Sequence, residues 1–98
     1  MMKNHKIKLI DNTYSKEEAK DLLLALLNDK IKFLQMKIFS LQERLGADTQ
    51  HLEKRVNELK QEKTQLLSKI KELGEKEYAV DIDCHVYLKV HHKEDVLV

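Results

Sequence analysis

Apolar residues recur through the middle of the chain at alternating steps of three and four positions, which is the spacing of one face of an α-helix. Ser15 can cap such a helix, and Glu18 can return a bond to the backbone three residues later. Arg44 and Gly46 mark the other end, because glycine readily takes the left-handed conformation that closes a helix. We therefore expect a helix over about 16–45.

A second helix is expected almost immediately after the first. Asp48 can cap it and Gly74 can end it, which gives a helix over about 49–73. The connection over 46–48 is so short that the second helix has to fold back along the first. The two segments therefore predict a long helical hairpin.

Both predicted helices carry a heptad pattern, which favours an antiparallel coiled coil between them. The fold-back places Leu45 near Leu52 and Leu24 near Leu73. Lys63 breaks the pattern, and it can either extend its ammonium group to water or meet a carboxylate of another chain. The predicted hairpin seam consists of Leu24, Leu27, Ile31, Leu34, Ile38, Leu41, Leu45, Leu52, Val56, Leu59, Leu66, Ile70 and Leu73.

Two further segments alternate polar and apolar residues with a period of two, which indicates β-strands. The first is short, about 6–10, and the residues that follow it, Asp-Asn-Thr-Tyr, are typical of a turn. The second covers about 78–90 and has one polar, solvated face and one apolar face. A tail over 91–98 follows it. The two strands run in opposite directions relative to the hairpin, so they can pair antiparallel. We expect a single domain, 1–98, mainly α with a small β element, in the order β-α-α-β.

The first helix is apolar over more of its circumference than a seam with one other helix can hide. The apolar face of the strands can cover part of this additional apolar surface of the first helix. That alternative by itself gives a monomer. A first strand of about five residues, however, leaves most of a second strand of about 13 without a partner in its own chain. We therefore expect a homodimer or a dimer of dimers in which the second strand pairs across chains, with the orientation of the hairpins left open. The predicted oligomer interface consists of Leu22, Leu26, Phe33, Met36, Val80, Ile82, Val86 and Leu88.

The composition narrows the range of partners and compartments. The 98 residues include 18 basic and 17 acidic ones in an interspersed order, with a net charge of +1, which disfavours nucleic acid as the main partner. The single cysteine, Cys84, fits a reducing compartment. No apolar run reaches the roughly 18 residues of a membrane span, and the start of the chain does not resemble a signal peptide. We expect a cytoplasmic protein of bacterial character that does not interact with membranes.

Potential metal ligands cluster in and after the second predicted strand. One group consists of Cys84, His85, His91 and His92. Neighbouring residues of a strand point to opposite faces, and the spacing matches no zinc motif. A small core cysteine and solvated histidines are the simpler interpretation.

A second group, Asp81, Asp83 and His85, shares one strand face, with about 6.6 Å between successive side chains. This arrangement could suit a metal site or an acid–base pair, and a small metal-dependent enzyme is the third functional hypothesis. Alternating charges are more often a solvated strand face. We therefore predict no catalytic residue, no metal and no cofactor.

The second helix carries basic residues that offer an alternative function. These residues are Arg55, Lys60, Lys63, Lys69 and Lys71. Interspersed glutamates favour ion pairs within the helix over a nucleic-acid site. Our lead hypothesis is a non-enzymatic structural or interaction protein that self-associates, such as an adaptor or scaffold. The alternative is a regulatory module that contacts nucleic acid or a partner protein through this basic side.

The segment over 13–48, TYSKEEAKDLLLALLNDKIKFLQMKIFSLQERLGAD, resembles one found in short uncharacterised bacterial proteins. In those proteins a serine-capped, leucine-rich helix is followed by residues similar to Ser40, Glu43, Arg44, Gly46 and Asp48 before a second helix. The resemblance covers about the first half of the chain. It implies a helical hairpin and no activity.

Overall fold

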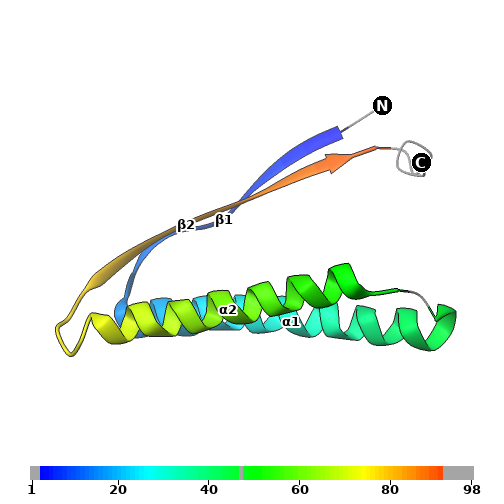
Figure 1. The fold of residues 1–98 in the computed structure, drawn as a ribbon. Coiled ribbons are helices and arrows are strands. Elements are labelled where there is room, and N and C mark those ends of the chain that lie inside the picture. Colours follow the sequence, from blue (N-terminus) through cyan, green and yellow to red (C-terminus); the bar gives the residue numbers. More distant parts are fainter. Residues whose placement is uncertain (1–2, 47, 92–98) are drawn as a thin grey trace.

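The computed structural model of the protein describes residues 3–46 and 48–91, and it places two long helices beside a two-stranded antiparallel ribbon. The elements follow in the order β1 (Lys3–Ser15), α1 (Lys16–Leu45), α2 (Gln50–Glu72) and β2 (Ala79–Val90). The molecule is long and thin, at 52 × 33 × 15 Å (Figure 1). The predicted β-α-α-β order and the mainly helical content are therefore confirmed.

The bounds of α1 are those expected from its capping residues. The amide of Glu18 donates to Ser15 Oγ at 3.1 Å, and the amide of Ser15 donates to Glu18 Oε1 at 3.0 Å. Gly46 has a φ of 58° and its amide donates to the carbonyl of Gln42, which closes the helix. The capping box and the terminal glycine thus fix the two ends of α1.

α2 begins at Gln50, and its N-cap residue is Thr49 rather than the predicted Asp48. Asp48 instead accepts a bond from the amide of Gln50 at 3.0 Å, which closes a turn just outside the helix. Thr49 is buried, and its hydroxyl accepts a bond from Gln42 Nε2 at 2.9 Å. This bond ties the tip of the hairpin to α1.

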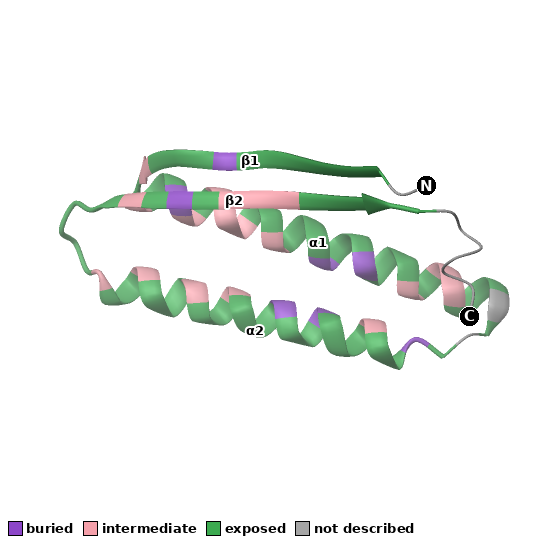
Figure 2. Cartoon of the chain, turned by 90° about the horizontal axis from the view of Figure 1, so that it is seen from above, coloured by how far each residue is buried: buried purple, intermediate pink, exposed green. Residues whose placement is uncertain are grey.

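The two helices pack side by side along a seam with a buried centre (Figure 2). The centre consists of Ile31, Leu34, Val56 and Leu59, with Leu27, Ile38 and Leu52 packed around it. Five further seam residues are half-buried, namely Leu24, Leu41, Leu66, Ile70 and Leu73. The side chain of Leu45 lies outside the described part of the structure. Lys63 is also half-buried, and it forms no ion pair with any described residue.

β1 is much longer than the predicted strand over 6–10. It pairs antiparallel along the whole of β2, from Lys3 opposite Val90 to Ser15 opposite Ala79. The segment 11–14, expected to be a turn, is extended because β2 supplies partners for its backbone. The expectation that most of the second strand lacks a partner in its own chain is therefore wrong.

Among the described residues, the ribbon packs against α1 near the end of the molecule where β1 passes into α1, which we call the junction end. A second buried cluster lies there and consists of Ile10, Ala19 and Ile82, with Tyr14, Leu22, Leu23, Val80 and Cys84 packed around it. Ala19 is 0% exposed, because its small side chain lets the strands approach the helix closely. Beyond this cluster the ribbon diverges from the hairpin, and its far end is formed by Lys3 of β1 and Val90 of β2 (Figure 1).

Candidate interaction surfaces

The ribbon has an inner face toward α1 and an outer face away from it. Ile10 and Ile82 define the inner face, since both are buried against Ala19. Side chains alternate along β2, so Val86, Leu88 and Val90 lie on the same inner face as Ile82. Ile7 shares this face because it lies directly opposite Val86; a register shift between Lys8 and Ile10 interrupts the alternation of β1. These four residues, Ile7, Val86, Leu88 and Val90, are called the distal inner face. Ile7, Leu88 and Val90 are 38%, 41% and 54% exposed, because the ribbon has left the helix at this point.

The first helix carries a matching apolar surface. Leu22 packs against the ribbon, and Leu26 and Phe33 follow on the same helix face, four and eleven positions later. Together with Met36, Leu26 and Phe33 form what we call the α1 stripe. Phe33 and Met36 are 60% and 63% exposed. The helix face that is covered at the junction end thus continues uncovered along α1.

The eight residues predicted as an oligomer interface fall into three groups in the single chain. Leu22, Val80 and Ile82 belong to the core at the junction end, so their own chain already covers them. Val86 is half-buried, and the other four residues, Leu26, Phe33, Met36 and Leu88, are exposed. The predicted interface does not include five further apolar residues that the structure leaves exposed, namely Ile7, Leu9, Phe39, Tyr87 and Val90. The alternation of the strands contained the signal for Ile7 and Val90, but only the pairing with β2 places them beside Val86 and Leu88.

The outer face of the ribbon brings together two of the three residues of the candidate metal site, Asp83 and His85, whereas Asp81 has a different partner. The Thr13 hydroxyl donates to Asp81 Oδ1 at 2.6 Å, whereas His85 Nε2 lies 2.6 Å from Asp83 Oδ1. Within 3–46 and 48–91, no group of three or more His, Cys, Asp or Glu side chains is arranged to hold a metal ion.

The other candidate metal cluster is also dispersed. Cys84 lies on the inner side of the ribbon, packed against the junction-end core, whereas His85 lies on the outer face. His91 is exposed at the end of the described chain, and His92 lies outside the described residues. These side chains therefore do not form one site.

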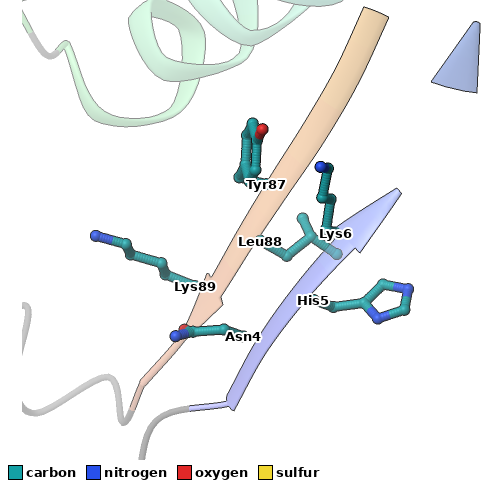
Figure 3. Close-up of a pocket in the computed structure, with 6 residues that line it drawn as sticks. All are labelled: Asn4, His5, Lys6, Tyr87, Leu88 and Lys89. Carbon is teal, nitrogen blue, oxygen red and sulfur yellow. The ribbon is translucent and has the colours of Figure 1, made fainter. Parts of the chain in front are cut away.

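A shallow pocket lies at the far end of the ribbon (Figure 3). It is lined by Asn4, His5, Lys6, Tyr87, Leu88 and Lys89, which come from both strands. The ammonium group of Lys6 lies 5.5 Å from the centroid of the Tyr87 ring, a cation–π distance. Tyr87 is nevertheless 69% exposed, so most of its ring remains open to a further contact.

The basic side of α2 is partly neutralised within the helix. Arg55 Nη1 lies 3.2 Å from Glu58 Oε1, three residues further along. Such pairs are typical of a solvated helix face. This arrangement gives the alternative of a basic site on α2 no specific support.

Comparison of the chain with protein-family models, with curated proteins and with solved structures found no match. Neither α1 nor α2, over the residues that the structure describes, has an apolar stretch long enough to cross a lipid bilayer. Any functional conclusion therefore rests on the surfaces described above.

Proposed function

We propose that the protein is a non-enzymatic structural or interaction protein that self-associates and acts as a scaffold. In this proposal the α1 stripe and the distal inner face are buried against a second copy of the chain. The observation that carries the proposal is the 60% and 63% exposure of Phe33 and Met36 on a helix face that is covered at the junction end. Contiguous large apolar side chains left in water are characteristic of contact surfaces.

We favour a second copy as the occupant because each chain carries both surfaces that such a contact needs, an inner ribbon face and an apolar face of α1. The chain already packs these two surfaces against each other at the junction end. At the junction end, the inner face of the ribbon packs Ile10 and Ile82 onto Ala19 of α1. The distal inner face and the α1 stripe continue these same two surfaces without covering each other. Two chains related by a twofold axis can each supply a ribbon to the helix of the other, which makes the contact reciprocal and closed.

The small core of the single chain supports the same proposal. Among the described residues, seven apolar side chains are buried: Ile10, Ala19, Ile31, Leu34, Val56, Leu59 and Ile82. A thin chain of 98 residues buries a modest share of its surface when it folds alone, and association is a common further source of stability. We further infer that the hairpin packs as an antiparallel coiled coil, since its buried centre lies at heptad positions.

Replacement of Phe33 tests this proposal. Phe33→Asp places a charge in the middle of the α1 stripe, away from the seam, so we expect the affinity of self-association to fall by more than about tenfold while the helical content is retained. Sedimentation velocity measures the association, and far-ultraviolet circular dichroism measures the helical content.

Asn28→Asp is the matched control. Asn28 is exposed on the same helix, and the substitution adds the same single charge without entering the stripe. The control should associate as the wild type does. A Phe33→Asp variant that is folded and as large as the wild type at every concentration would contradict the proposal.

A further inference from the structure

The charges of the ribbon are separated along its length. We call residues 3–8 and 85–90 the basic half, because they contain four lysines and no Asp or Glu. We call residues 9–15 and 79–84 the acidic half, because they contain three aspartates and no Lys or Arg. Register pairs the two strands within each half, so each half is a distinct region of the ribbon surface.

Six of these seven charges lie on the outer face of the ribbon. The register places Lys6, Lys8 and Lys89 on it in the basic half, and Asp11, Asp81 and Asp83 in the acidic half. All six residues are exposed. The outer face therefore carries its three lysines on one side of the middle of the ribbon and its three aspartates on the other. Where the two halves meet, Lys8 Nζ lies 3.2 Å from Asp11 Oδ2 of the same chain, and both side chains remain exposed.

A surface with equal and opposite halves complements itself when one copy is reversed against another. A twofold axis that crosses two stacked ribbons at their middle places the acidic half of each on the basic half of the other. A parallel arrangement instead places acidic on acidic and basic on basic halves. Charge complementarity of this kind selects orientation and register more than it adds affinity.

We propose that the outer faces of the ribbons of two chains stack antiparallel, with Asp11, Asp81 and Asp83 of each chain facing Lys6, Lys8 and Lys89 of the other. Tyr87 lies on the same face and is 69% exposed, so it supplies apolar area that charges alone lack. The lysine beside its ring, Lys6, is one of the three basic residues of the contact.

The acidic half argues for a second copy over a nucleic acid as the occupant of this face. A nucleic acid that followed the ribbon from the basic half would meet the three aspartates of the acidic half and be repelled. A protein surface that alternates in sign, as this one does, gains from both halves. The outer face of a second copy of the chain is such a surface.

This contact rests on the proposed function, because it assumes self-association, but it uses a different face of the chain. The α1 stripe and the distal inner face lie on the inner side of the ribbon, whereas this contact lies on the outer side. Two separate self-contacts in one chain build an assembly larger than a dimer: a closed tetramer if their twofold axes intersect at a right angle, and an open chain of copies if the axes do not intersect. A scaffold needs this ability to join more than two copies.

Charge reversal on the whole chain tests the contact. One variant carries Asp81→Lys and Asp83→Lys, which makes both halves basic, and a second carries Lys6→Glu and Lys89→Glu, which makes the basic half acidic. For each variant alone, the affinity of the outer-face contact should fall by more than about tenfold, because like charges then face each other. An equimolar mixture of the two should recover it as a one-to-one complex. A third variant with all four changes should recover it alone, since its halves are again complementary.

Sedimentation velocity at about 50 mM and about 500 mM NaCl measures these associations, and circular dichroism verifies folding. If the wild type associates and the folded single-half variants associate equally well, or if mixing restores nothing, the outer-face contact is overturned while the proposed function stands. If the wild type is monomeric throughout, both are overturned. Binding of a mixed-sequence DNA duplex by the wild type, abolished by Lys6→Glu with Lys89→Glu, would identify nucleic acid as the occupant and also overturn the contact.

Discussion

Ser15 and Glu18 join β1 directly to α1 through a reciprocal pair of hydrogen bonds between side chain and backbone. Ser15 is at once the last residue of β1 and the N-cap of α1, so no loop separates the strand from the helix. The capping box therefore fixes the point at which the strand ends and the helix begins.

Loss of the cap should destabilise the fold. We expect Ser15→Ala to lower the free energy of unfolding by about 1 kcal/mol, because the amide of Glu18 loses its acceptor. Urea denaturation followed by circular dichroism measures the change. Ser68→Ala, on an exposed position of α2, is the control and should stay within about 0.5 kcal/mol of the wild type. Equal effects of the two substitutions would show that the cap contributes nothing.

The same motif predicts a dependence of stability on pH. The backbone amide of Ser15, and after it the Ser15 side chain, holds the pKa of Glu18 below its ordinary value by stabilising the charged carboxylate. A carboxyl with a lower pKa in the folded chain adds stability above its unfolded pKa, and this stability is lost as the pH falls through the folded pKa. The stability advantage of the wild type over Glu18→Gln should therefore be full near neutral pH and shrink below a pH of about 4.5. An advantage that stays constant down to a pH of about 2 would contradict this assignment.

The sequence predicted the hairpin well because local signals specify both of its ends. Ser15, Glu18 and Gly46 act through bonds within a few residues of one another, and the heptad pattern of the seam is a local period. The strand β1 was underestimated because Asp11 and Asn12 are residue types that favour turns and are depleted in strands. Their extended conformation depends on β2, nearly 70 positions away; Thr13, for example, bonds to Asp81.

The candidate surfaces could be predicted only in part for a related reason. The helical spacing of apolar residues places Leu22 and Phe33 in one stripe. The ribbon nevertheless covers Leu22 and leaves Phe33 exposed. Where the ribbon leaves the helix depends on the angle at the junction, which no local pattern encodes. The separation of charge on the outer face likewise requires the register, since the lysines and aspartates come from both strands.

The contact between ribbon and helix at the junction end depends on the small size of Ala19. Ala19 is 0% exposed beneath Ile10 and Ile82, so a larger side chain has no space. We expect Ala19→Leu to lower the free energy of unfolding by about 1–3 kcal/mol through overpacking. Ala25→Leu, at an exposed position of the same helix, is the control and should have little effect. Thermal and urea unfolding of both variants measure the difference; an Ala19→Leu variant as stable as the control would contradict the packing described.

Lys63 distinguishes packing within the chain from packing between chains. It is half-buried at a heptad position of α2 and lacks an ion-pair partner among the described residues. If the ammonium group only reaches water, Lys63→Leu should raise the free energy of unfolding by about 1 kcal/mol, because more apolar area is buried in the seam. Lys60→Leu, on the exposed side of α2, is the control and should not stabilise the chain. Weaker self-association of Lys63→Leu in sedimentation would instead indicate a carboxylate partner on a second copy.

The central claim is that the chain self-associates, and the molecular mass of the unmodified protein in solution tests this claim most directly. Sedimentation equilibrium from about 1 μM to about 100 μM measures that mass without a tag or a label. We expect a mass of at least twice the 11.6 kDa of one chain, rising toward a tetramer or larger species as the concentration increases. A single species of 11.6 kDa across this range would contradict the account.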